Sequence, residues 1–225
     1  MPPRLLLADA DSAADALTFA GRADRFTDEA VRLQASGGVL VMTAAPLAPR
    51  GIGDATPTVL AMRTLAADPE LVCDLVVEAS ALSAAPDDAT AVQLPDTALS
   101  PAWAGIAPPR SGWTAREGID ASVLASKAQG GIARVAEAVP TDAGEDVVRA
   151  IRASVWGAPD DELAGLPLGA AFAAMSMGFI SGAETARLFT SGPWTRLSLD
   201  RGHVIVRGPA VMGLTPVRRT GATDR

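Results

Sequence analysis

The chain has 225 residues, of which 48% are hydrophobic and 20% charged, and its formal net charge at pH 7 is −7. This length allows a sizeable core, and the balance of residue types excludes an intrinsically disordered chain. Surfaces that bind nucleic acid normally carry a basic excess, because counterion release supplies most of their affinity. The acidic balance therefore argues against a nucleic-acid partner.

From residue 1 to residue 95 the pattern predicts mainly β-structure. Ser36-Gly37-Gly38 separates two alternating apolar runs, which is typical of a hairpin. Asp11 or Ser12 is placed to cap a helix that ends near Gly21. The predicted elements are a strand over 5–7, a helix over 12–21, hairpin strands over 31–35 and 39–43, and strands over 57–65, 71–79 and 91–94.

The second half of the chain begins with a loop and continues with helices. Residues 95–118 are rich in Pro, Gly and Trp and lack a clear period, which predicts an ordered loop. Residues 119–190 are predicted to be helical, with a capping box formed by Asp142 and Glu145. The first predicted helix covers 121–139 and is capped by Asp120. The second starts after Asp142 and ends at Gly157, and the third is the apolar segment 166–181, which is rich in small side chains.

The end of the chain returns to β-structure. Residues 194–208 predict a hairpin that rejoins the N-terminal sheet, because an isolated two-stranded hairpin is marginal in water. Strands at both ends of a helical middle favour an α+β fold with a mostly antiparallel sheet. We expect one domain over residues 1–225, divided into a β-rich region over 1–95, the loop 95–118, a helical region over 119–190 and the hairpin.

The residue types that support most catalysis and metal binding are nearly absent. The chain has one histidine, His203, and one cysteine, Cys73, although acid–base catalysis near neutral pH, thiol chemistry and zinc binding mostly use these side chains. No Walker A loop, His-Glu-x-x-His pair, Cys-x-x-Cys pair or Gly-x-Ser-x-Gly turn occurs. We therefore expect no recognisable enzyme, no catalytic residues, no metal and no cofactor.

The two rare residues and the acidic clusters have ordinary structural interpretations. His203 follows a tight turn and is expected to be a surface or hydrogen-bonded residue, and Cys73 to be a small apolar residue of a strand. Acidic clusters at 142–146 and 160–162 stand where helices are predicted to begin, where negative charge is stabilising. We interpret them as caps and not as metal ligands.

Targeting signals are absent from the sequence. A single cysteine cannot form an intrachain disulfide, which fits a reducing compartment. The first residues lack the apolar stretch of a signal peptide. The longest apolar stretch, 166–180, is shorter than the roughly 20 residues of a spanning helix. We expect a cytoplasmic protein without a membrane partner.

Two similar loops are the candidate ligand site. Ala45–Gly51 and Ile106–Gly112 each place an arginine, Arg50 or Arg110, directly after a proline and ahead of a glycine. Proline fixes the backbone beside the arginine, and a guanidinium suits a carboxylate or phosphate. Trp103 and Trp113 flank the second loop and are candidates to stack on a guanidinium or on the ligand. The alternative is that these are ordered loops, in which both arginines pair with the chain's own carboxylates and the tryptophans fill the core.

Four segments carry a resemblance to other proteins: Ala45–Gly51, Ala102–Gly105, Thr141–Asp146 and Arg201–Val204. With these segments the chain resembles an uncharacterised group of actinobacterial hypothetical proteins. The resemblance implies a GC-rich bacterial origin. It implies no activity and no catalytic residues.

Two functions from different classes follow from these observations. The first is binding of a small anionic metabolite at the Arg50 and Arg110 loops. The second is a non-enzymatic module that self-associates or docks a partner protein. An enzyme that uses carboxylates alone remains a third possibility, because acids distant in sequence can meet in space. We expect a homodimer with its interface on a strand edge or on the predicted helix 166–181.

Overall fold

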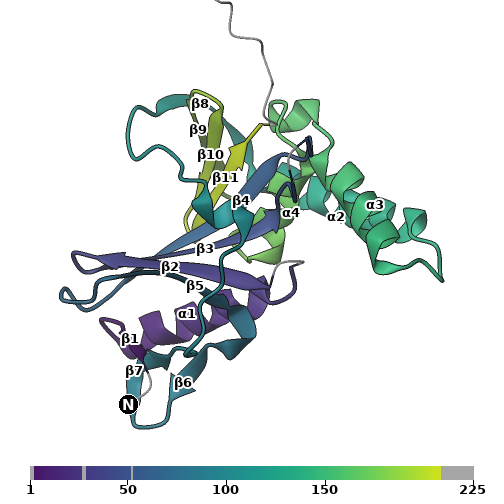
Figure 1. Ribbon diagram of the computed structural model, residues 1–225. Helices are drawn as coiled ribbons and strands as arrows, with labels where there is room; N and C mark the ends of the chain where they lie inside the picture. Colours follow the sequence, from purple (N-terminus) through teal and green to yellow (C-terminus); the bar gives the residue numbers. More distant parts are fainter. Residues whose placement is uncertain (1–2, 27–28, 52, 209–225) are drawn as a thin grey trace, which may run out of the picture.

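The computed structural model describes residues 3–26, 29–51 and 53–208, and in them the predicted α+β fold with mostly antiparallel sheets is confirmed (Figure 1). The strands are β1 (Arg4–Leu6), β2 (Ala30–Ser36), β3 (Val39–Leu47), β4 (Thr58–Ala66), β5 (Cys73–Glu78), β6 (Ser83–Ala85), β7 (Asp88–Gln93), β8 (Thr114–Asp120), β9 (Thr185–Ser191), β10 (Trp194–Leu199) and β11 (Gly202–Arg207). The α-helices are α1 (Ala10–Ala23), α2 (Ala121–Ala138), α3 (Glu145–Gly157) and α4 (Leu168–Ser176), and short 3₁₀ turns are η1 (Ala79–Ala81), η2 (Ala102–Gly105) and η3 (Asp161–Leu163).

The larger sheet joins both halves of the chain. Its eight strands follow the order β5-β2-β3-β4-β11-β10-β9-β8, and every neighbouring pair is antiparallel. At its centre β11 pairs with β4, so that Val204 lies opposite Ala61 and Val206 opposite Val59. The C-terminal hairpin therefore completes the sheet of the N-terminal half, as the alternation of its apolar residues predicts.

The two halves repeat one arrangement. In the first, α1 precedes the meander β2-β3-β4, and in the second α4 precedes the meander β9-β10-β11. The last strands of the two meanders, β4 and β11, pair with each other in the middle of the sheet. The sheet is thus nearly symmetric about the β4–β11 pair, although the second half carries the additional helices α2 and α3.

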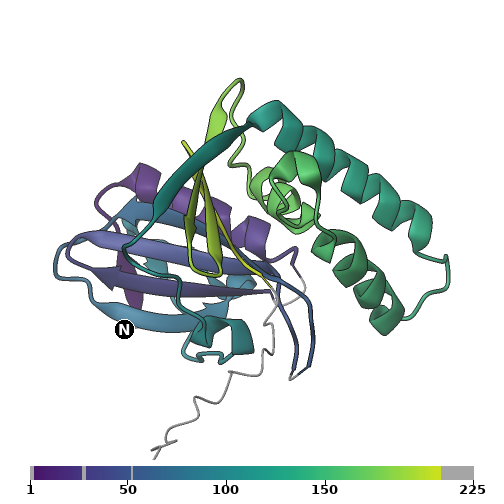
Figure 2. The same cartoon turned by 90° about the horizontal axis from the view of Figure 1, so that it is seen from above.

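One face of the large sheet carries the main core. α1 lies between this face and a three-stranded sheet of order β1-β7-β6 (Figure 1). α4 is largely buried, because its small Gly and Ala residues let it pack closely on α2, β4 and β11. Figures 1 and 2 show α2 and α3 extending from the body of the molecule as a two-helix arm.

The opposite face of the sheet is covered by the predicted Pro- and Trp-rich loop. Trp103 is 2% exposed and packs with Leu60, Trp194 and Ile205 in a second, smaller cluster. The Arg32 guanidinium donates to the Ala104 carbonyl at 2.6 Å and also pairs with Asp74, which ties the loop to β2 and β5. This loop therefore serves as the cover of an apolar sheet face.

Local sequence signals explain several element ends. Gly37 and Gly38 have φ of 59° and 81° and form the β2–β3 turn, which needs residues that accept positive φ. The N-cap of α1 is Asp9, ahead of both predicted caps, Asp11 and Ser12, and its carboxylate accepts the Ser12 N–H at 2.7 Å. Gly178, at φ 64°, follows α4 and ends it well before the predicted residue 181.

The capping-box prediction for α3 is wrong. Its N-cap is Gly144, with no side-chain cap bond, and Glu145 and Asp146 occupy the first turn of the helix, where the helix dipole favours acidic residues. Strands β6, β8 and β9 were not predicted. β8 and β9 occupy positions within the segments predicted as loop and helix, 95–118 and 119–190.

Candidate functional site

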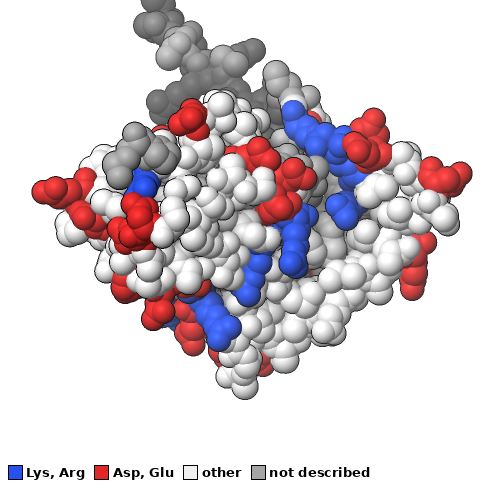
Figure 3. Space-filling view, turned by 90° about the horizontal axis from the view of Figure 1, so that it is seen from below, with Lys and Arg blue, Asp and Glu red and all other residues white. Residues whose placement is uncertain are grey.

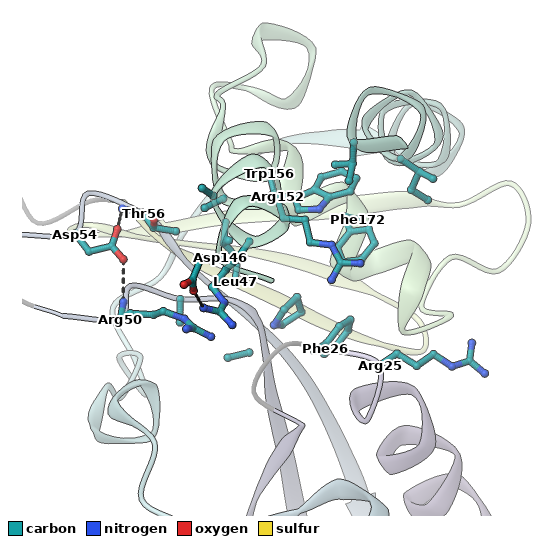
Figure 4. A pocket seen from close by; sticks show the side chains of 18 of the residues that line it. Arg25, Phe26, Leu47, Arg50, Asp54, Thr56, Asp146, Arg152, Trp156 and Phe172 are labelled. Carbon is teal, nitrogen blue, oxygen red and sulfur yellow. Dashed lines mark hydrogen bonds and ion pairs between the residues drawn. The ribbon is translucent and has the colours of Figure 1, made fainter. Parts of the chain in front are cut away.

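A groove of about 860 Å³ lies between the helical arm and the end of the β3–β4 hairpin (Figure 4). Five segments of the chain line it: the end of α1, the β3–β4 connection, the second half of α2, one face of α3, and α4. Its α3 side runs from Asp146 to Trp156, eleven residues whose ends lie about 15 Å apart along the helix axis. The groove is therefore elongated along the arm.

Aromatic side chains form the floor of the groove. The Trp156 and Phe172 rings stack with centroids 4.4 Å apart, and Phe26 lies 6.2 Å from Phe172 in a tilted arrangement. Leu47 closes the floor from β3, while Ile132 and Val135 extend the apolar surface along α2. Ile132 is 43% exposed, so some of this apolar surface faces solvent.

The position of Trp156 depends on a close helix contact. A Cβ on Gly131 of α2 would stand 2.2 Å from the Trp156 ring, so only glycine lets α2 and α3 approach this closely. Gly169 of α4 is similarly close, because a Cβ there would lie 3.0 Å from the Trp156 carbonyl oxygen. Gly131 thus makes room for the indole, and Gly169 lets α4 approach the α3 backbone at Trp156.

Basic side chains stand around the floor. The lining includes Arg25, Arg50, Arg149 and Arg152, against the two carboxylates Asp54 and Asp146. Figure 4 shows Arg50 and Arg152 reaching toward the groove from opposite sides, and Lys and Arg side chains crowd around a hollow in the right-hand half of Figure 3.

Both carboxylates at the groove are engaged locally. Asp146 accepts a hydrogen bond from Arg149 at 2.6 Å. Asp54 accepts the backbone N–H groups of Arg50 and Thr56, each at 2.9 Å, and so shapes the β3–β4 connection. Hydrogen bonding by Thr56, and then by the Arg50 N–H, lowers the pKa of Asp54. Within the described chain, the guanidiniums of Arg25, Arg50 and Arg152 make no ion pair.

The two predicted loops do not meet at this groove. Arg50 lines it, whereas Arg110 is exposed on the loop before β8 and does not belong to the lining. Trp103 is buried on the opposite face of the sheet. Trp113 lies near Trp103 and donates its indole N–H to the Pro109 carbonyl at 3.0 Å.

Trp113 does stack on a guanidinium, but on one from another element. Arg196 of β10 lies between two rings, with its Cζ 4.8 Å from the Trp113 centroid and 4.7 Å from that of Phe189. Burial, together with the nearby charge of Arg187, lowers the pKa of Arg196. This sandwich is an internal cation–π contact of the sheet.

His203 and Cys73 occupy the positions expected of structural residues. His203 Nδ1 lies 3.1 Å from the Ser198 hydroxyl on the neighbouring strand. Cys73 is half-buried, and its thiol lies 3.8 Å from the Leu33 carbonyl. Burial raises the pKa of the Cys73 thiol, which disfavours the reactive thiolate.

The acidic cluster at 160–162 begins η3 and pairs with the chain's one lysine. Asp160 accepts the Glu162 N–H at 3.0 Å, and Lys127 pairs with Asp160 and Glu162 at 3.0 and 2.6 Å. In residues 3–26, 29–51 and 53–208, no three His, Cys, Asp or Glu side chains gather in a way that would hold a metal ion. In the same residues no helix has the length and apolar character that crossing a membrane requires.

Family comparisons divide the chain into the same two halves. Residues 1–105 match one domain of unknown function, DUF8010, and residues 108–211 match a second, DUF8185. The junction lies within the loop that covers the outer sheet face. No curated protein matches the chain.

Solved structures similar to this chain include DNA polymerase sliding clamps. For the clamp of Caulobacter crescentus the identity is 15% and the TM-score 0.47, over 97% of this chain and 70% of that one. For a putative DNA polymerase III beta subunit of Eubacterium rectale the identity is 8% and the TM-score 0.48, over 92% of this chain and 65% of that one. For the Bartonella birtlesii clamp bound to griselimycin the identity is 14% and the TM-score 0.47, over 95% of this chain and 66% of that one.

The predicted binding of a small anionic ligand at the two Pro-Arg-Gly loops is wrong. The positions of the two loops overturn it. A joint site requires Arg50 and Arg110 to converge, but Arg110 lies outside the groove that Arg50 lines. The tryptophans that were expected to complete the site pack over the other sheet face instead.

Sequence reasoning missed most of the groove. Trp156, Phe172 and Phe26 carry a usable signal, because large aromatic residues are scarce in a chain with 4% aromatics. Arg149 and Arg152 lie on the side of α3 that lines the groove, whereas the apolar Val148, Ile151 and Val155 of the same helix lie outside the lining.

Proposed function

We propose that the chain is a non-enzymatic protein-interaction module, and that the groove beside the helical arm receives an extended segment of a partner protein. The observation that carries this proposal is an aromatic floor lined on several sides and left open to solvent, with arginines at its edge that make no ion pair among the described residues. Grooves with buried aromatic anchors and a polar rim are the usual form of energetic centres in protein interfaces.

The shape of the groove favours a peptide segment. The α3 side is about 15 Å long, which accommodates about five residues of extended chain at roughly 3.3 Å each. Ile132 continues the apolar lining toward the exposed surface of the arm. A partner segment that covers this surface removes apolar area from water and so gains binding free energy.

A displayed library of random 12-residue peptides tests the proposal. The wild-type chain is expected to enrich peptides that carry two or more large apolar residues. Ala150→Trp fills the groove from an exposed position on α3 and should abolish the enrichment. Ser154→Trp is the matched control, because Ser154 is exposed on the same helix but does not line the groove. Equal enrichment by wild type and Ala150→Trp contradicts the proposal.

Self-association is a second candidate, and the edge strand β8 favours it. Among the described strands β8 pairs with β9 alone, and Thr114 to Gly118 are exposed along it. The other edge, β5, is partly covered, because the Leu99 N–H donates to the Val76 carbonyl at 2.7 Å. An uncovered edge offers unpaired backbone groups to a second copy. The predicted alternative interface, helix 166–181, is unsuitable where it forms α4, whose small side chains are buried within the chain.

Light scattering over a dilution series tests self-association. A homodimer through β8 gives twice the mass of the 22.9 kDa chain at high concentration. The amides of residues 114–118 should then exchange more slowly with solvent than they do in the dilute chain. A constant mass of 22.9 kDa contradicts this second candidate.

A further inference from the structure

The charge at the groove differs from the charge of the chain as a whole. The chain has a net charge of −7, yet four arginines and two carboxylates line the groove. One arginine, Arg149, is matched by Asp146, and the other carboxylate, Asp54, is bound to backbone N–H groups of its own loop. The groove therefore presents a local excess of positive charge on an acidic protein.

The positive charges are placed on both sides of the apolar floor. Arg50 stands on the β3–β4 connection and Arg152 on α3, and both reach toward the groove (Figure 4). Arg25 follows the end of α1 and its C-cap Asp24, and it precedes Phe26 in the chain. All three are exposed, so they retain hydration and form the rim of the groove, while the aromatic rings form its base.

The apolar floor and the charged rim of the groove together define the chemistry of the segment that fits it. The rings and aliphatic side chains of the floor match apolar residues, and guanidiniums match carboxylates through paired N–H donors. Rim charges steer association and select the partner more than they set affinity. A basic segment would leave three guanidiniums next to like charge, which is unfavourable.

We propose that the groove recognises an acidic-flanked apolar segment, in which one or two large apolar side chains occupy the Trp156–Phe172 floor and Asp or Glu residues on either side contact Arg50 and Arg152. This inference rests on the proposed function and specifies the partner's chemistry. It extends the role of Arg50 from the excluded small-ligand site to one side of a peptide groove.

A charge-reversal experiment tests this inference separately from groove binding itself. The double variant Arg50→Glu, Arg152→Glu inverts the rim charge at two exposed positions. Arg110→Glu, Arg134→Glu is the matched control: it changes the net charge equally at two exposed positions that do not line the groove. Each protein is offered the 12-residue library, and peptides enriched by the wild type are titrated by fluorescence anisotropy.

We expect the wild type and the control to enrich apolar residues flanked by Asp or Glu, and the rim variant to enrich Lys or Arg in the same flanks. Acidic peptides should bind the rim variant about tenfold more weakly than the control, and added salt should weaken their binding to the wild type.

Three results would overturn the inference. Apolar peptides that bind the wild type, depend on position 150 and show no acidic preference would overturn it and leave the proposed function standing. Absence of groove-dependent binding would overturn both. If light scattering shows a dimer for the wild type and a monomer for Ala150→Trp alone, the occupant of the groove is a second copy of this chain.

Discussion

At the residue scale, the charge state of His203 is coupled to the fold. Burial lowers its pKa, and the positive charges of Arg196 on β10 and Arg187 on β9 lower it further. The ring lies against Ser198 on β10, on the sheet face that also carries the Arg196 sandwich. A neutral imidazole therefore belongs to the native sheet.

This leads to a prediction about pH. Because the folded pKa lies below the unfolded value of about 6.5, the unfolded chain binds more protons as the pH falls through this interval. The free energy of unfolding should therefore decrease from about pH 6.5 down to the folded pKa. Chemical denaturation of the wild type and of His203→Gln measures this. A pH dependence that persists unchanged in His203→Gln would show that another group is responsible.

Local sequence patterns predict the settings of His203 and Cys73 but not the separation of Arg50 from Arg110. A lone histidine after a turn and a cysteine on a strand are correctly described by their local patterns, since burial and hydrogen bonding follow from alternation along one strand. The Arg50 and Arg110 loops were grouped because their sequences are alike. Similar loop sequences do not place two loops together, because the path of the sheet between them decides where each one lies.

At the element scale, periodicity predicts best where an element has one buried and one solvent-facing side. The hairpins β2–β3 and β10–β11 and helix α2 fit this condition and were predicted close to their bounds. β8 is an edge strand with five exposed residues in succession, so it shows no alternation of apolar and polar residues. The groove combines five separate segments, and no local pattern contains that information.

The small residues of α4 give a prediction about packing. Ala171 is fully buried in this helix, which lies between the sheet and the arm. Ala171→Leu adds three carbon atoms to a close-packed site and should lower the free energy of unfolding by about 1–3 kcal/mol. Ala133→Leu, at an exposed position of α2 outside the groove lining, is the control. Urea denaturation checks the difference, and equal stability of the two variants would show that α4 has room beside it.

At the scale of the whole molecule, the large sheet joins the two halves of the chain, and the groove is the place where we expect a partner to bind. The central β4–β11 pair joins two similar halves into one sheet, and the loop with Trp103 covers its outer face. The helical arm is the addition that breaks this symmetry, and the groove lies where the arm meets the β3–β4 hairpin. The partner is therefore expected at the arm and not at the Trp-covered face.

The indole N–H resonances of the four tryptophans test this claim most directly. Trp156 lies in the groove floor, whereas Trp103, Trp113 and Trp194 belong to the opposite sheet face. On titration with a peptide enriched from the library, two-dimensional ¹H–¹⁵N NMR should show the Trp156 signal, assigned with Trp156→Phe, shifting while the other three stay in place. Shifts of the Trp103, Trp113 or Trp194 signals with an unmoved Trp156 signal would contradict the account.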